Sequence, residues 1–223
     1  MVPAPDRFVL GDAEVFRVVE WLGPLAPVAD LFPDTPREVW QGHTWLAPHF
    51  HERASERYRA AVQTWVVRTG GLTVLVDTGV GNDRDRPQAP GFSSLATDFL
   101  RRLAAAGVAP EDVDVVVNTH IHYDHVGWNT RRDGDRWVPT FPNATYLLPA
   151  PDVEHFHPDN ADQVRAPRTE DEARRFAGAR LVYADSITPV LEAGQVRAWR
   201  EPHDLPGGMH LAPAPGHTVS YRV

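Results

Sequence analysis

The sequence predicts an α/β fold, because strand, helix and strand patterns follow one another between residues 61 and 120. Residues 61–69 (AVQTWVVRT) and 72–79 (LTVLVDTG) are two β-rich runs separated by two glycines, which is typical of a hairpin with a tight turn. Residues 93–107 (SSLATDFLRRLAAAG) have the apolar spacing of a helix. Residues 110–120 (PEDVDVVVNTH) then form a nearly continuous apolar run, typical of a strand covered on both faces. This order of elements favours a layered α/β architecture.

The boundaries of the predicted helix rest on single residues. Ser93 or Ser94 can cap its start, and Gly107 is placed where a C-terminal cap belongs. The remaining elements are predicted from weaker patterns: strands over residues 14–20, 146–148, 196–199 and 210–212, a helix over 171–177, and a Pro-rich loop over 22–36. Because no repeat, low-complexity tract or charge shift divides the chain, residues 1–223 are predicted to form a single domain.

Composition excludes several classes of function. The net charge is −8, and no Lys/Arg-rich run is present, so nucleic acid is not an expected partner. No signal-peptide pattern and no apolar stretch of roughly 18 residues is found, which predicts a cytoplasmic location and no membrane contact. The sequence has no cysteine, so a metal ion would have to be bound by His, Asp or Glu.

The run VVVNTHIHYDHVGWN, residues 115–129, concentrates metal-ligand residue types at the end of a predicted strand. His120 and His122 are two apart, so both side chains leave the strand end on the same side and can converge on one ion. Asp124 and His125 follow where the chain turns, which would aim them at a second position a few ångströms away. A histidine-rich surface loop is the alternative, but such close packing of these groups gains little without an ion.

The motif HIHYDH resembles the HxHxDH motif of the metallo-β-lactamase superfamily. LVDTG upstream and PGHT downstream fit that family in the same order, and the continuation HVGWNTRRDGDRWVPTFPNATYLLP is similar to the branch of quorum-quenching lactonases and methyl parathion hydrolase-like enzymes. The resemblance implies a four-layer αββα sandwich. It also implies a hydrolase of carboxylic esters or lactones, N-acyl-homoserine lactones among them, that uses a metal-bound hydroxide; thioesters and phosphotriesters are alternative substrates.

The resemblance also implies roles for individual residues. The first metal would be bound by His120, His122 and His217, and the second by Asp124 and His125, with Asp124 also acting in catalysis. Asp77 would be the outer carboxylate that orients the ligands, although it could equally be a turn residue. Zinc is the default ion, two per complete family member, and manganese, iron or cobalt also suit such ligands.

The sequence departs from the family pattern after His217, where only TVSYRV follows. The family's bridging aspartate and final histidine come after that motif, so we expect the domain to be incomplete at the C-terminus, with the later part of the second half missing. A truncated product, a fragment and a natural deletion all fit. An exposed sheet edge favours pairing with another chain, such as a homodimer. A non-catalytic metal-binding remnant is the alternative to a hydrolase.

Several other histidine, acidic and aromatic residues have types that can serve a functional site. His49, His51, His155 and His157 are predicted to be loop histidines, and His203 and Asp204 to lie on the surface. Tyr123 is expected to pack rather than react. Four aromatic residues could either wall an apolar pocket beside the metal or belong to the core: Trp45, Trp128, Trp137 and Phe141.

Overall fold

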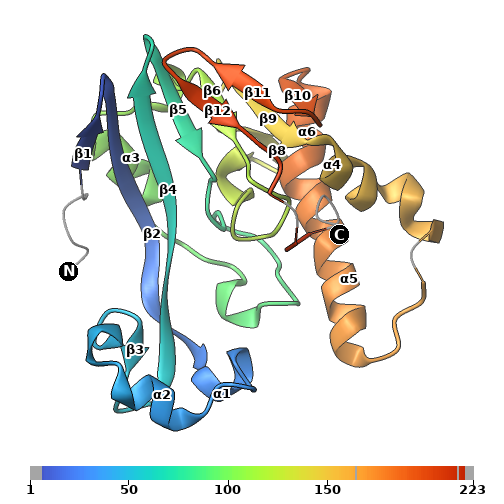
Figure 1. Cartoon of the computed structure of the whole chain (residues 1–223). Coiled ribbons are helices and arrows are strands. Elements are labelled where there is room, and N and C mark those ends of the chain that lie inside the picture. Colours follow the sequence, from blue (N-terminus) through green and yellow to red (C-terminus); the bar gives the residue numbers. More distant parts are fainter. Residues whose placement is uncertain (1–6, 164, 215, 219–223) are drawn as a thin grey trace.

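The computed structural model describes residues 7–163, 165–214 and 216–218, and its main feature is a mixed sheet of eight strands (Figure 1). These strands are β1 Arg7–Leu10, β2 Ala13–Pro27, β3 His51–Glu52, β4 Arg57–Thr69, β5 Leu72–Val76, β6 Val115–Val117, β9 Thr145–Pro149 and β10 Val196–Trp199. Their order is β1-β2-β4-β5-β6-β9-β10, with β3 paired to β4. The strands from β1 to β5 pair antiparallel, whereas β5, β6, β9 and β10 run parallel.

Two small hairpins and short helices complete the described fold. The hairpins are β7 Thr130–Asp133 with β8 Arg136–Pro139, and β11 His203–Leu205 with β12 Met209–Leu211. The helices are α1 Val28–Leu31, α2 Arg37–Gly42, α3 Phe99–Ala105, α4 Ala150–Phe156, α5 Glu170–Val182 and α6 Thr188–Glu192, with a π-helical turn, Tyr183–Ile187, between the last two. No helix in the described ranges combines the length and the apolar character needed to cross a bilayer.

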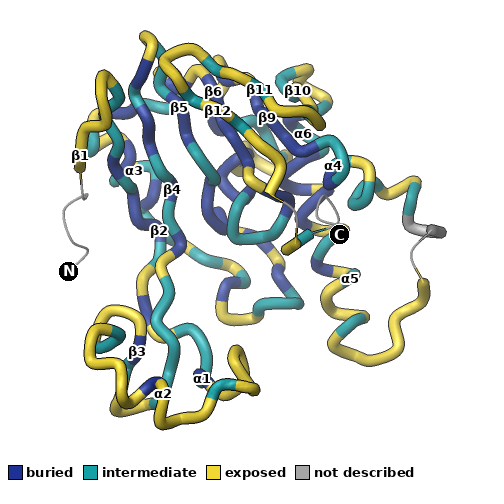
Figure 2. Tube along the Cα trace, in the orientation of Figure 1, coloured by how far each residue is buried: buried dark blue, intermediate teal, exposed yellow. Residues whose placement is uncertain are grey.

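The sheet is covered on both faces, which confirms the predicted α/β class. Because side chains alternate along a strand, β4 and β6 supply both cores. On one face Val66 and Val116 pack with Phe99 and Leu103 of α3. On the other face Val67, Val74, Val115, Val117 and Leu147 pack against residues of β11 and β12. Helices, the main sheet and a small second sheet thus form successive layers, and the buried segments of Figure 2 follow the central strands.

The hairpin predicted from Gly70 and Gly71 is confirmed, because β4 and β5 pair antiparallel across these two residues. Both glycines have positive φ, 55° and 78°, a region that other residues rarely adopt. Gly70 is further restricted by its neighbour Gly207, since a Cβ at Gly70 would lie 2.6 Å from the Gly207 nitrogen. The turn therefore requires glycine for packing as well as for backbone geometry.

The predicted start of the helix over residues 93–107 is wrong. Helix α3 begins at Phe99 after Asp98, and Ser94 has a φ of 55° that no helix residue adopts. The reason is tertiary: the Thr97 N–H donates to Asn82 Oδ1 (2.8 Å), and the Asn82 amide donates to the Thr97 carbonyl (2.9 Å). These contacts hold residues before Asp98 in an extended loop. The predicted cap Gly107 has a φ of 85°, as a residue following a helix commonly does.

The Pro-rich loop predicted over residues 22–36 is also wrong. Strand β2 continues to Pro27, and α1 follows directly. Pro24 is tolerated because the pairing of β2 with β4 has register shifts at 19–21 and 24–26. The long β2–β4 pair carries α1, α2 and β3 away from the rest of the sheet (Figure 1). Conversely, β6 is shorter than the predicted strand and ends at Val117, since the chain turns there into the histidine-rich segment.

Candidate metal centre

The candidate site lies where three neighbouring parallel strands end. Asp77 follows β5, the segment from His120 to His125 follows β6, and Asp152 lies in the first turn of α4 after β9. The carboxyl ends of parallel strands meet at one edge of the sheet, where ligand sites of α/β folds commonly form. The sheet topology therefore brings together residues that are far apart in the sequence.

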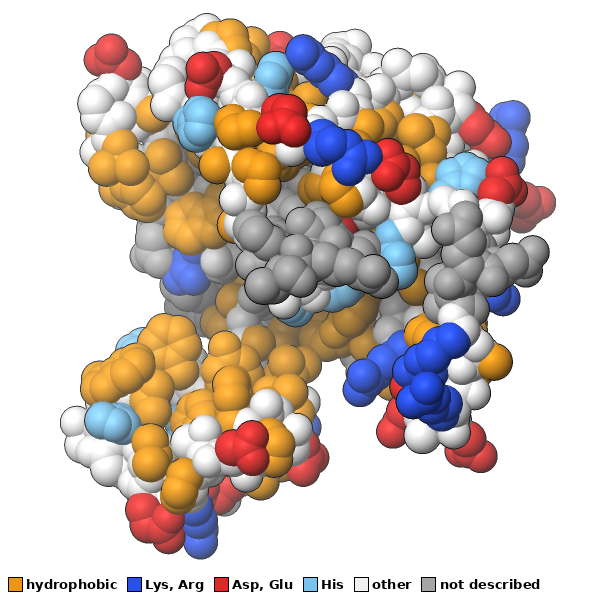
Figure 3. Space-filling view, turned by 45° about the vertical axis from the view of Figure 1, so that its right-hand side comes forward, with side chains coloured by type: hydrophobic (Ala, Val, Ile, Leu, Met, Phe, Trp, Pro, Cys, Tyr) orange, Lys and Arg blue, Asp and Glu red, His pale blue; other side chains and the backbone are white. Residues whose placement is uncertain are grey.

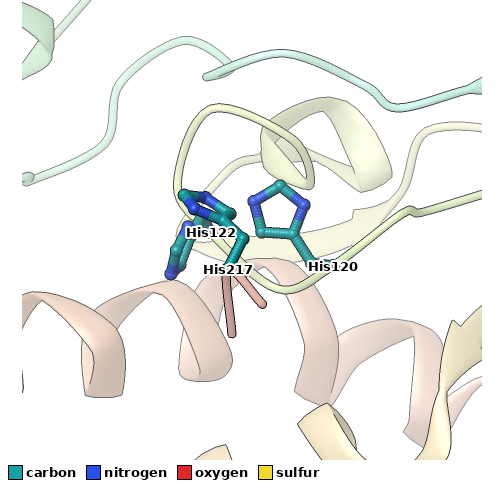
Figure 4. Close-up of side chains that lie close together, drawn as sticks. All are labelled: His120, His122 and His217. Atoms are coloured by element: carbon teal, nitrogen blue, oxygen red, sulfur yellow. The ribbon is translucent and has the colours of Figure 1, made fainter. Parts of the chain in front are cut away.

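Three imidazoles converge at this edge. One ligand atom from each of His120, His122 and His217 lies within 4.8 Å of the others. The ring centroids of His120 and His122 are 4.6 Å apart, and that of His217 is 4.8 and 4.9 Å from the two. Figure 4 shows the three rings gathered together, with His217 arriving from a different segment of the chain. The three imidazoles are therefore near enough to one another to converge on a shared cation.

The state of these imidazoles fits a metal ion. His120 is 6% exposed, and its Nε2 is buried with no hydrogen-bond partner among the described residues. Burial, followed by the neighbouring imidazoles, lowers the pKa of His120 to about 2, and burial also lowers the pKa of His122. Both rings are therefore neutral near pH 7, as a ligand must be. An unpartnered buried nitrogen is costly unless a cation or a proton donor completes it.

Asp77 holds His125 at the edge of this cluster. Its Oδ2 lies 2.7 Å from His125 Nδ1, while its Oδ1 accepts from the Thr119 N–H (2.8 Å). Burial acts to lower the pKa of His125, but the Asp77 carboxylate outweighs it, so the pKa is raised. Asp77 also has a φ of 55°, a strained conformation for a residue with a side chain. Asp77 thus combines a left-handed backbone conformation with a carboxylate that contacts the His125 ring.

Asp124 and His125 lie beside the three-histidine group rather than within it. His125 Nε2 is 3.5 Å from Asp124 Oδ2, and the ring centroids of His125 and His120 are 4.0 Å apart. Since Asp77 binds Nδ1 of His125, the Nε2 atom is the one that faces Asp124. The predicted second pair is therefore brought together next to the first group.

The backbone of the histidine segment is fixed by buried polar contacts. The His125 carbonyl accepts from the Thr78 N–H (2.7 Å) and the Asn118 amide (2.9 Å). Asn129 in turn donates to Asn118 Oδ1 and accepts from Thr78 Oγ1 (2.9 and 2.8 Å). These contacts join the ends of β5 and β6 and preorganise the ligands.

Asp152 is a site residue that the sequence reasoning missed. It is fully buried, and its two carboxylate oxygens accept from the Ile121 N–H and from Thr218 Oγ1, each at 2.9 Å. Ile121 lies between two of the histidines, and Thr218 directly follows His217. Asp152 therefore ties the two histidine-bearing segments together. Its one sequence signal is an acidic residue shortly after the apolar strand 145–149.

Buried charges behind the site were missed as well. Glu20 accepts from the Val80 and Gly81 N–H groups (2.7 and 3.1 Å) and from Trp128 Nε1 (2.7 Å), and burial raises its pKa despite these bonds. Arg84 and Arg86, both buried, bind the carboxylate of Asp185 in the π-helical turn. These two groups anchor the loop after β5 to β2 and to the helices. A glutamate within an apolar strand was the available signal for the first.

The aromatic residues considered for a pocket wall have different positions in the structure. Trp128 and Phe141 are buried core residues, with Trp128 stacked on Phe99. Trp137 lies under the Arg84 guanidinium, whereas Trp45 is 66% exposed and outside the site. Tyr123 packs as predicted among hydrophobic side chains, and burial raises its pKa to about 12.

The prediction of loop histidines is wrong for two residues. His51 lies in β3 and is fully buried against Trp40, and His155 lies in α4. The spacing of two residues within the pairs His49/His51 and His155/His157 did not indicate that one histidine of each pair lies in a strand or a helix. Asp204 is exposed as predicted, and His203 is partly buried; both lie in β11.

The chain belongs to the metallo-β-lactamase superfamily, whose family model matches residues 57–221. Solved structures with a similar fold include a hydrolase of the β-lactamase superfamily, AbOPH (24% identity, TM-score 0.67, 89% of this chain and 62% of that one). Others are a probable metal-dependent hydrolase from Staphylococcus aureus (15%, TM-score 0.68, 96% and 68%) and AidC, a dizinc quorum-quenching lactonase (18%, TM-score 0.55, 87% and 60%). The chain therefore spans about 60 to 68% of these proteins' length.

Proposed function

We propose that the chain hydrolyses carboxylic esters or lactones with the help of divalent metal. The observation that carries this proposal is the convergence of His120, His122 and His217, with the buried Nε2 of His120 left without a partner. Membership of the superfamily and the likeness to a dizinc lactonase support it. N-acyl-homoserine lactones are substrates to test, because the structure of that lactonase contains the product N-hexanoyl-L-homoserine.

In this proposal the three histidines bind one ion, and Asp124 with His125 binds a second. A bound divalent ion, with zinc as the default, supplies a water of lowered pKa and polarises the carbonyl oxygen. Asp77 keeps the His125 proton on Nδ1, so that Nε2 presents its lone pair. Asp124, partly exposed and 3.5 Å from His125 Nε2, would accept a proton from the attacking water.

The overall reaction adds water across the acyl C–O bond. The oxygen of water bonds to the carbonyl carbon, the bond to the leaving alkoxide breaks, and the alkoxide takes up a proton. A lactone opens to a hydroxy acid by the same steps. In this reaction the chain would supply neutral imidazoles, as the lowered pKa values of His120 and His122 indicate. It would also keep the proton of His125 on Nδ1, beside Asp77.

The test is metal content and turnover of purified protein loaded separately with zinc, manganese, iron or cobalt. We expect metal to remain after gel filtration and aryl esters or lactones to be hydrolysed. His122→Ala should remove both, whereas His49→Ala, an exposed histidine outside the group, should change neither. Retained turnover in His122→Ala would refute the site.

A panel of lactone, thioester, phosphotriester and β-lactam identifies the preferred substrate. Bound metal without turnover of any panel member would instead support a non-catalytic metal-binding protein. Loss of metal and of turnover in both histidine variants would point to a general defect in folding, which thermal unfolding distinguishes.

A further inference from the structure

A cavity opens beside His122, between α4, residues 157–158 and 165–167, and α5. Its volume is about 550 Å³, within the range of small-molecule sites. Its apolar walls are formed mainly by Ile121, Tyr123, Phe156, Phe176 and Val182. One wall thus belongs to the histidine segment itself, and the opposite wall belongs to α5. A molecule bound at the metal centre can extend an apolar portion into this space.

The charged residues that line this cavity are all basic. They are Arg165, Arg175 and Arg180, and none of the described lining residues is Asp or Glu. This is unusual in a chain with a net charge of −8. Figure 3 shows basic side chains gathered on the α5 side of the molecule, next to hydrophobic surface. A cleft lined by charges of one sign raises the local concentration of ions of the opposite sign.

The three arginines differ in how far they are already neutralised. Arg165 forms two bonds with Glu172, at 2.9 and 2.6 Å, so its charge is largely satisfied. Arg175 and Arg180 are exposed on α5; Arg175 lies within electrostatic reach of Glu172, whose pKa it helps to lower, but the strongest effect on that carboxylate comes from Arg165. A guanidinium offers paired donors that match a carboxylate.

We propose that this cavity binds the acyl chain of the substrate, and that Arg175 and Arg180 select acyl chains that end in a carboxylate. The preferred substrates are then monoesters of aliphatic dicarboxylic acids, or lactones with an acidic side arm. This inference rests on the proposed function, because the cavity is lined by His122, where the proposed metal would hold the scissile bond. It adds a specificity that the metal ligands alone do not provide.

The experiment compares matched anionic and neutral ligands on the metal-loaded full chain. For binding, the probes are the monoanilides of adipic and suberic acid against hexananilide and octananilide, which resist hydrolysis, measured by calorimetry. For turnover, the probes are the corresponding 4-nitrophenyl esters. We expect the acidic member of each pair to bind about tenfold more tightly, and added salt to reduce that difference.

The double variant Arg175→Gln with Arg180→Gln should abolish the preference for the acidic ligand and leave the neutral ligand within about twofold. Arg174→Gln is the matched control, since Arg174 lies on the same helix, pairs with Asp171 and does not line the cavity. Equal binding of acidic and neutral ligands to the unmodified protein would overturn the inference. So would a preference that survives in the double variant.

The two proposals fail in different ways. Ester turnover without any acidic preference refutes the selection by arginine and leaves the hydrolase proposal standing. An acidic preference in calorimetry without turnover refutes the hydrolase proposal and identifies the cavity as an anion-selective binding site.

Discussion

Replacing Asp152 with asparagine tests whether one buried carboxylate holds the ligand set together. The carboxylate accepts from the Ile121 N–H and Thr218 Oγ1 at 2.9 Å each, and it is fully buried. An amide in its place keeps one oxygen for the Ile121 N–H, but its NH2 can only donate, so the Thr218 hydroxyl would have to turn round and accept, and both bonds lose the charge of the carboxylate. A hydrogen bond to a charged group contributes about 1.5–3 kcal/mol. We therefore expect metal affinity to fall about 10- to 100-fold.

The assay is competition for zinc against a chromophoric chelator, combined with thermal unfolding of the metal-free protein. The control is Glu154→Gln, which removes a carboxylate from the same helix α4 at a site that is exposed and bound to Arg200. The control should retain the affinity of the unmodified chain. Unchanged zinc affinity in a folded Asp152→Asn variant would show that His122 and His217 are positioned without this carboxylate.

Three further predictions follow from buried groups. The pKa of His120 is lowered to about 2 in the folded protein, whereas in the unfolded chain the ring takes up a proton below about pH 6.5. The unfolding free energy of the metal-free protein should therefore fall as the pH drops below about 6.5. Urea titrations at pH 7, 6 and 5 should show a smaller fall in His120→Gln, and an identical fall in both proteins would contradict the assignment. Asp185→Asn leaves the buried guanidinium groups of Arg84 and Arg86 without their carboxylate, so the unfolding free energy measured in urea should fall by about 3–5 kcal/mol. A loss under about 1 kcal/mol would mean that water or backbone groups satisfy the two guanidinium groups. Gly127→Ala places a Cβ 1.9 Å from the Val80 backbone, so this variant should lose at least about 3 kcal/mol, and near-normal stability would show that the two loops separate easily.

The pattern of apolar residues was sufficient to predict the central strands. Local hydrophobic spacing and the position of the glycines predict the hairpin β4–β5, the buried strand β6, and the strands β9 and β10. The start of α3 could not be predicted, because Asn82, 15 residues earlier in the sequence, bonds Thr97 and holds the residues before α3 extended. Local propensity has no access to such a partner.

The histidine pair of the candidate site was predictable because His120 and His122 are close in the sequence. The residues that support the pair were harder to find. Asp152 and Glu20 carry no distinctive motif, and their role depends on burial and on donors supplied by other segments. The same holds for Arg84 and Arg86, whose charges are balanced by an aspartate about one hundred residues away.

The sequence by itself determined the family and the chemical type of the ligands, because HIHYDH and the absence of cysteine limit a metal site to imidazole and carboxylate. The PGHT motif had already indicated that His217 joins the other two imidazoles, and the structure brings the three together. Tertiary structure alone decided that Asp152 bonds both of their segments and that basic residues of α5 line the cavity beside them. The physical reason is that strand ends are aligned by backbone hydrogen bonds across the sheet, and side chains from distant segments become neighbours only when that sheet has formed.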